Sequence, residues 1–231
     1  MKSNFVTYCL FLSLLSLTSM QLYAQDWANL KRYQTENSLL SAPKANENRV
    51  VFMGNSITQG WNEKDSVFFQ TNPYICRGIS GQTTPQMLIR FRQDVVELHP
   101  EIVVILAGTN DIAGNTGPST LEMIMDNLSS MTEIAKANKI KVILCSVLPA
   151  YDYPWRKGLE PNIKIPKLNN MIKEYCSKTN TFYLDYFLAM ADEKNGMKAE
   201  LNTDGVHCTL EGYKVMETLV QEAIGKVMKA K

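Results

Sequence analysis

Five short apolar runs recur along the chain, and longer segments of helical character separate them. Several of the runs are nearly continuous in valine, isoleucine and leucine, which is the pattern of strands that are covered on both faces. The connections are long enough to hold crossover helices, so the alternation predicts an α/β fold with helices on both sides of a parallel sheet of about five strands. The expected strands are residues 49–53, 74–79, 101–107, 141–148 and 181–187.

Four of the other segments repeat apolar side chains at helical spacing. The expected helices are residues 85–98, 119–137, 165–175 and 210–228. The longest irregular stretch, residues 149–166, follows the fourth expected strand and carries Tyr151, Tyr153 and Trp155. Ligands of open α/β sheets bind beyond the carboxyl ends of the strands, so we expect this loop to form one wall of a substrate pocket.

The first 24 residues have the features of a secretory signal peptide. Lys2 precedes an apolar run over residues 5–17, and Ala24 provides a small residue at the expected cleavage point. The run is too short to favour a membrane span, and no cysteine for lipid attachment lies at the cleavage point. We therefore expect residues 25–231 to form a single catalytic domain, exported to the periplasm or the extracellular space without stable membrane insertion.

The charge and cysteine content exclude several classes of partner. Lysine and arginine number 24 against 23 aspartates and glutamates, spread along the chain, for a formal net charge of +1. This balance gives no electrostatic footprint for nucleic acid, so a small-molecule or glycan ester is the expected partner. Two histidines and no Cys-x-x-Cys argue against a structural zinc site. Disulfide formation and the oligomeric state stay open, and the cysteines concerned are Cys76, Cys145, Cys176 and Cys208.

Polar blocks follow three of the expected strands and precede the last expected helix. The carboxyl ends of parallel strands meet at one edge of a sheet, so the first three blocks are expected to converge there. The blocks are residues 54–56, 78–83, 108–111 and 204–207.

Together these blocks contain the parts that nucleophilic acyl transfer needs: a hydroxyl, a base, a carboxylate that orients the base, and donors for an oxyanion. Ser56 is the candidate nucleophile, His207 the base, and Asp204, three residues before His207, the orienting carboxylate. The oxyanion donors are expected to be the backbone N–H groups of Ser56 and Gly81 and the side-chain amide of Asn110.

The four blocks resemble the motifs of the SGNH hydrolases, also called GDSL-type esterases and lipases. The serine, glycine, asparagine and histidine motifs of that family correspond to residues 54–57, 81, 108–111 and 204–207, in the same order. The resemblance implies a flavodoxin-like, three-layer α/β/α fold and ester hydrolysis through an acyl-serine, without a metal or another cofactor. One position departs from the pattern, because Asn55 stands where the family usually has an aspartate.

Each residue also has a purely structural reading. Ser56 and Asp204 could cap helices, and Gly81 could serve a turn. For Asp111 we prefer a structural role in its loop. Cys208 directly follows the proposed base, but neighbouring residues on a helical turn point in different directions, which argues against a cysteine nucleophile.

The sequence thus predicts a secreted serine esterase for short acyl chains, in the first place acetyl, on carbohydrate. The rivals are an acyl hydrolase of the lysophospholipase or thioesterase type, and a module that binds acylated glycans without cleaving them. The expected substrate contacts are Asn55, Trp61, Tyr151, Tyr153 and Trp155.

Overall fold

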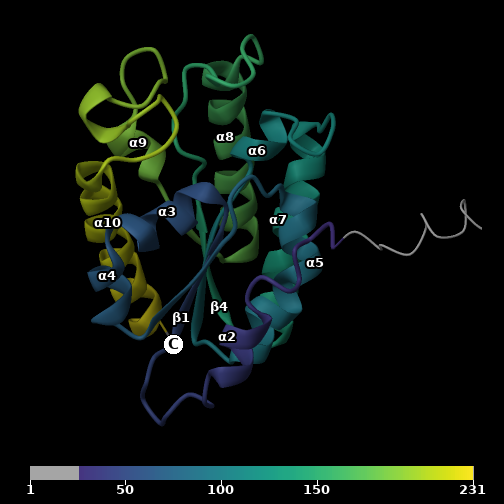
Figure 1. The fold of residues 1–231 in the computed structure, drawn as a ribbon, viewed down its shortest axis with the longest axis vertical. Coiled ribbons are helices and arrows are strands. Elements are labelled where there is room, and N and C mark those ends of the chain that lie inside the picture. Colours follow the sequence, from purple (N-terminus) through teal and green to yellow (C-terminus); the bar gives the residue numbers. More distant parts are fainter. Residues whose placement is uncertain (1–25, 231) are drawn as a thin grey trace, which may run out of the picture.

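A five-stranded parallel sheet forms the centre of the protein in a computed structural model that describes residues 26–230 (Figure 1). The expected signal peptide, residues 1–24, lies outside the described residues. The strand order is β2-β1-β3-β4-β5, so β2 lies on one side of β1 and the three later strands lie on the other. The strands are β1 (Val50–Gly54), β2 (Tyr74–Gly78), β3 (Ile102–Leu106), β4 (Lys141–Cys145) and β5 (Phe182–Leu184). The predicted α/β fold is confirmed.

Side chains of each strand alternate between two apolar cores, one on either face of the sheet. Val51 and Met53 face one core, which is closed by α5 (Thr84–Asp94), α7 (Leu121–Ala137) and α8 (Pro161–Thr179). On the other face, Val50 and Phe52 pack against the remaining main helices. These are α3 (Ser56–Lys64), α4 (Ser66–Gln70) and α10 (Leu210–Lys229). Figure 1 shows the resulting three layers, with α10 and α4 on one side and α5 and α7 on the other.

Short helical elements fill the connections. Among them, α2 is a helix before the first strand that the apolar pattern did not predict. They are α2 (Gln34–Leu39), η1 (Val96–Leu98), α6 (Thr109–Ile112), α9 (Tyr186–Met190) and η2 (Ala199–Leu201).

The expectation of an irregular stretch over residues 149–166 is partly wrong, because α8 begins at Pro161. A proline in the first turn costs a helix little, since the N–H it lacks has no intrahelical acceptor there. Pro166 lies further in and cannot donate to the Asn162 carbonyl, but the side-chain amide of Asn195 donates to that oxygen at 3.1 Å. The helix therefore continues through Pro166.

The strand register brings the polar blocks to one edge of the sheet. Gly54, the last residue of β1, is paired with Gly78 of β2 and Leu106 of β3, so three strands end at the same level. At the opposite edge lies His99, in a left-handed conformation after η1.

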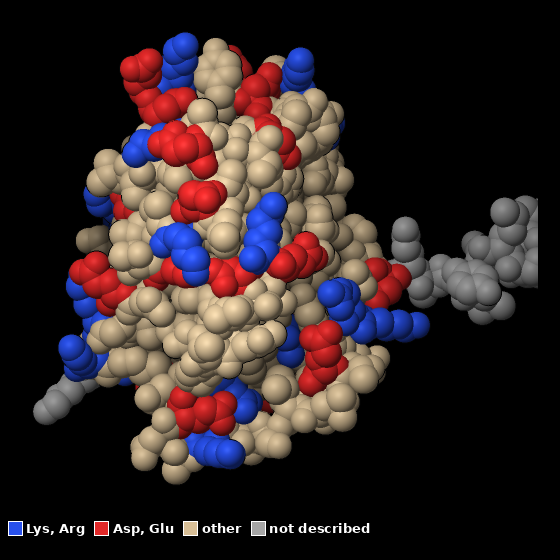
Figure 2. All heavy atoms as spheres, turned by 60° about the vertical axis from the view of Figure 1, so that its left-hand side comes forward, with Lys and Arg blue, Asp and Glu red and all other residues tan. Residues whose placement is uncertain are grey.

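The four cysteines outside the expected signal peptide are free thiols in this structure, and three of them are buried. None of the helices within residues 26–230 is long and apolar enough to cross a membrane. Figure 2 shows acidic and basic side chains interspersed over the face that carries α10 and α4, with no extended field of one sign.

Candidate active site

Ser56 is the first residue of α3, and a single residue separates it from the end of β1. That residue, Asn55, caps the helix: its Oδ1 accepts a hydrogen bond from the Ile57 N–H at 3.1 Å. A rigid strand and a capped helix thus hold the serine hydroxyl at the sheet edge. The side chain of Ser56 is half-buried.

His207 joins Ser56 to Asp204. Its Nε2 lies 3.0 Å from the Ser56 Oγ, and its Nδ1 lies 2.7 Å from the Asp204 Oδ2. An ionised carboxylate can only accept hydrogen bonds, so the ring proton belongs on Nδ1, and Nε2 is the acceptor for the serine hydroxyl. This is the arrangement that lets an imidazole remove a proton from a hydroxyl.

The loop before α10 fixes the positions of Asp204 and His207. The Asp204 Oδ1 accepts from the backbone N–H groups of Val206 at 3.0 Å and His207 at 2.8 Å. Burial pushes the pKa of Asp204 upward, but the hydrogen bonds from His207 and Val206 outweigh it and leave the pKa below its ordinary value. The carboxylate is therefore ionised at neutral pH and available to stabilise a protonated imidazole.

The loop after β2 brings Gly81 to the same edge in a left-handed conformation, with φ of +77°. A side chain is disfavoured at this φ, which accounts for a glycine here. Its carbonyl accepts from the side-chain amide of Asn115 at 3.1 Å, and the Ser80 N–H donates to the Gln59 side chain at 2.8 Å. Within residues 26–230 no oxygen accepts from the backbone N–H of Gly81 or of Ser56.

Asn110 lies in α6, directly after β3, and is 3% exposed. One N–H of its side-chain amide donates to the Gln82 carbonyl at 2.9 Å, and an amide nitrogen carries a second hydrogen. The fixed orientation of this amide suits a donor to a developing negative charge.

Asp111 has a structural place in the site. Its carboxylate accepts from the Thr84 backbone N–H at 2.9 Å and from the Thr84 hydroxyl at 2.6 Å, at the start of α5. Burial raises the pKa of Asp111 to about 6, against the opposing effect of these hydrogen bonds. This side chain ties α6 to the start of α5.

The sequence matches a model of the GDSL-like lipase/acylhydrolase family over residues 52–215. The chain belongs to this family. A GDSL-like lipase from Bacteroides thetaiotaomicron is 50% identical, with a TM-score of 0.84, over 86% of this chain and 98% of that one. A proposed acylhydrolase from Bacteroides fragilis is 47% identical, with a TM-score of 0.87, over 89% of this chain and all of that one.

Two other proteins match this GDSL-like chain at lower sequence identity or over a shorter length. An acetyl-xylooligosaccharide esterase from Geobacillus has the same fold, with a TM-score of 0.64 at 19% identity over 79% of this chain and 96% of that one. An uncharacterised lipoprotein of Bacillus subtilis, YqeF, is 35% identical over 75 residues, which is 31% of the length of each protein.

Aromatic side chains near the sheet edge that carries Ser56 in this GDSL-like protein fall into two groups. Trp155 is 46% exposed, and its ring centroid lies 6.1 Å from that of His207. Tyr151 is 58% exposed and borders a hollow of about 250 Å³ that Asp204 also lines. Both rings are open to a ligand.

The expectation that Trp61, Tyr153 and Asn55 contact the substrate is corrected by their burial. Trp61 is 1% exposed and stacks on Tyr213 in the core. Tyr153 is fully buried, and its hydroxyl donates to the Thr109 carbonyl at 3.0 Å. Asn55 is 1% exposed and serves as the cap described above.

A second hollow, of about 340 Å³, adjoins Gly81. Its lining is mostly polar and includes one exposed aromatic ring, that of Trp27, which the sequence alone did not single out. Cys208 faces away from the site: it is fully buried against Met216, and burial raises the pKa of its thiol to about 12. No cluster of three or more metal-binding side chains occurs among the described residues.

Proposed function

We propose that this acylhydrolase is a secreted serine esterase that removes short acyl groups, in the first place acetyl, from carbohydrate. The observation that carries the proposal is the continuous hydrogen-bonded series from Asp204 through His207 to Ser56. Purely structural roles for these three side chains would not require this series of contacts or these distances.

The proposed reaction has two halves. His207 Nε2 takes the hydroxyl proton as the Ser56 Oγ attacks the ester carbonyl, and Asp204 stabilises the imidazolium that forms. The negative charge on the former carbonyl oxygen is met by the N–H groups of Ser56 and Gly81 and by the Asn110 amide.

His207 then gives its proton to the departing alcohol, which leaves an acyl-serine. In the second half a water molecule loses its proton to His207 and attacks this ester. The acid is released, and the Ser56 hydroxyl is restored without a metal or another cofactor.

The surroundings of His207 support a polar alcohol. The leaving alcohol must receive its proton from His207, so it lies on the side where the Trp155 ring is exposed. An exposed aromatic face next to a departing alcohol favours a sugar, whose apolar ring face can stack on it. The fold is shared with an esterase that acts on acetylated xylo-oligosaccharides.

Export is part of the proposal. We propose that residues 1–24 are removed and that residues 25–231 form the exported catalytic domain. The low-identity match to a bacterial lipoprotein supports a location outside the cytoplasm.

The test is turnover of p-nitrophenyl acetate by the wild type, Ser56→Ala and Asn110→Ala. Ser56→Ala should abolish turnover, and Asn110→Ala should lower kcat by about 10²–10³, which is typical for the loss of one oxyanion donor. Labelling of Ser56 by a fluorophosphonate separates an esterase from a module that only binds. Unchanged turnover in the serine variant would sink the mechanism.

The acyl preference follows from the same assay with butyryl and octanoyl esters. We expect the acetyl ester to have the highest kcat/KM. A preference for octanoyl would point to a lysophospholipase or thioesterase type of activity instead.

A further inference from the structure

Arg90 is a fully buried arginine that links the ends of two strands. Its Nη2 donates to the carbonyls of Gly54 and Arg77, both at 2.9 Å, where β1 and β2 end. Its Nη1 lies 3.0 Å from the Asp94 carboxylate, and its Nε donates to the Gln82 side chain at 2.5 Å. A buried guanidinium is costly unless it is fully hydrogen-bonded, so this group holds its four acceptors in a fixed arrangement.

Gln82 connects this arginine to the loop of the proposed oxyanion hole. It directly follows Gly81 and is 4% exposed. Its Oε1 accepts from Arg90, its Nε2 donates to the Ala28 carbonyl at 2.7 Å, and its own carbonyl accepts from the Asn110 amide at 2.9 Å. Both ends of the side chain are thus used, and the backbone beside it contacts a proposed oxyanion donor.

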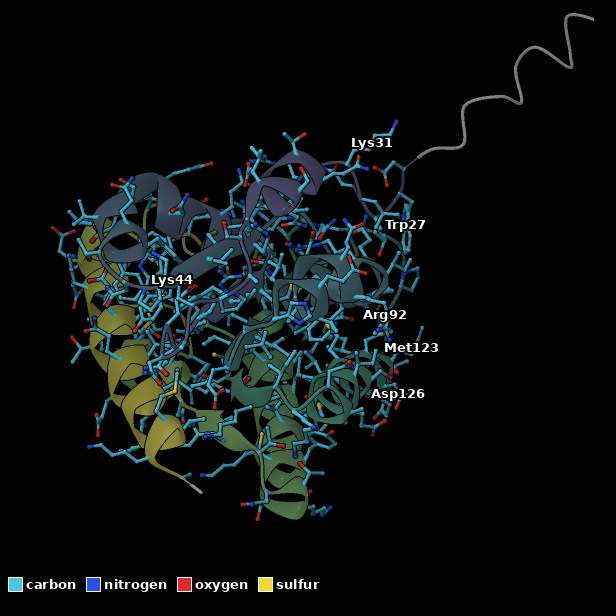
Figure 3. The ribbon with its side chains drawn as sticks, turned by 90° about the horizontal axis from the view of Figure 1, so that it is seen from below. Trp27, Lys31, Lys44, Arg92, Met123 and Asp126 are labelled. Carbon is cyan, nitrogen blue, oxygen red and sulfur yellow. The ribbon has the colours of Figure 1, made fainter. Side chains whose placement is uncertain are left out.

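The Ala28 carbonyl belongs to a segment, residues 26–39, that lies outside the part of the chain matched by the family model. This segment packs along α5 and the end of β2: the Tyr33 hydroxyl donates to the Gly78 carbonyl at 2.5 Å, and Gln93 Nε2 donates to the Leu30 carbonyl at 2.7 Å. Figure 3 shows Trp27 and Lys31 of the segment on the same flank as Arg92 of α5. The segment therefore packs against the loop that carries Gly81 and Gln82.

We propose that Gln82 is a positioning residue of the oxyanion hole, held by Arg90 on one side and by the Ala28 carbonyl of the N-terminal segment on the other. This inference rests on the proposed function. The side chain does not touch substrate; it fixes the Gly81 N–H relative to Ser56 and Asn110. Because an oxyanion forms only as the reaction proceeds, a misplaced donor lowers kcat and leaves KM nearly unchanged.

The variant that tests the proposal is Gln82→Met, which keeps the length of the side chain and removes both of its hydrogen bonds. We expect kcat for p-nitrophenyl acetate to fall by about tenfold or more, with KM changed by less than about twofold. The pH at which activity is half-maximal should not move, because His207 and Asp204 keep their contacts.

Two controls separate positioning from a general loss of structure. Lys136→Met removes a hydrogen bond from α7 to the Thr179 carbonyl at the end of α8, outside this network, and should leave kcat unchanged. Val227→Ala opens a small cavity at the distal end of α10 and should lower the melting temperature without lowering kcat. If Gln82→Met does not fold, Gln82→Glu keeps an acceptor for Arg90 and is judged by the same criteria.

Coupling to Asn110 provides the decisive readout. In the Asn110→Ala background the Gln82 substitution should cost less than about threefold in kcat, because the hole is already impaired. The same factor in both backgrounds, or a kcat above half the wild-type value for the single variant, would overturn the proposal. If Ser56→Ala is inactive while Gln82→Met is fully active, only this inference fails; if Ser56→Ala is active, the proposed function itself fails.

Discussion

Asn55 stands one residue before the proposed nucleophile, at the position where SGNH hydrolases usually carry an aspartate. The oxygen that caps α3 is Oδ1, which both side chains possess, so the change preserves the cap. The side chain is almost completely buried, and a carboxylate there would place a negative charge beside the hydroxyl that must lose its proton. Asparagine therefore keeps the local structure without this charge.

Asp111 gives a prediction about pH at the residue scale. Its pKa is raised from 3.8 to about 6 in the folded protein. A raised pKa means that folding favours the protonated form, so the stabilisation is complete below about pH 4 and is lost as the pH rises through about 6.

Between pH 4 and pH 7 the wild type should lose up to about 3 kcal/mol of unfolding free energy relative to Asp111→Asn, which does not titrate. Urea unfolding of both proteins across this range measures the difference. Parallel pH profiles would contradict the expected titration, and the comparison cancels the contribution of the other carboxylates.

Contact between β2 and α3 gives a prediction at the scale of elements. A Cβ added at Gly78 would meet the backbone of α3 at the Gln59 nitrogen, its nearest neighbour, and at the Thr58 carbonyl carbon, 2.7 Å away. Gly78→Ala should therefore push α3 away from the sheet, lower the unfolding free energy by about 1–3 kcal/mol and reduce activity through Ser56.

The matched control is Gly225→Ala in α10, where an added Cβ meets no atom within 4 Å. Alanine is a better helix former than glycine, so this variant should be more stable by about 1 kcal/mol. Denaturant midpoints of the two variants, measured against the wild type, check both signs. Equal effects of the two substitutions would show that the contact with α3 is not the cause.

The elements themselves differ in how far the sequence predicts them. All five strands begin within one residue of the expected runs, because burial on both faces leaves a strong local signal, but the runs 141–148 and 181–187 extend past the ends of β4 and β5. In contrast, α2 contributes no residue to the buried core and carries no apolar stripe, and hydrogen bonds such as that between Asn37 and Asp94 hold it to α5. Such distant polar contacts have no signature in the local pattern.

The same reasoning applies to the site. Ser56, His207 and Asp204 are brought together as expected. Ser56 follows a strand that the sequence predicts, and the other two precede a helix that it also predicts. Aromatic side chains were harder to place. Trp61 and Trp155 have the same chemistry, and only tertiary packing buries the first and exposes the second. Gln82 and Arg90 read as ordinary polar residues of a loop and a helix until their contacts are seen.

The balanced charge of the whole molecule predicts weak electrostatic steering. Acidic and basic groups alternate on the face shown in Figure 2, and the net charge is +1. For a neutral acetyl ester we expect kcat/KM to change by less than about twofold when the ionic strength rises from about 0.05 to 0.5 M. A steep fall with salt would reveal a charged substrate site that this distribution does not suggest.

The proposed nucleophile and base lie 151 residues apart in sequence and meet only when the loop before α10 docks against α3. A chain that has folded its first strands holds a serine but no partner for it, so hydrolysis cannot begin until the last part of the chain is in place. Return of esterase activity after dilution from denaturant therefore reports the completion of folding rather than its onset. A partly folded chain in which this loop has not docked is expected to be inactive.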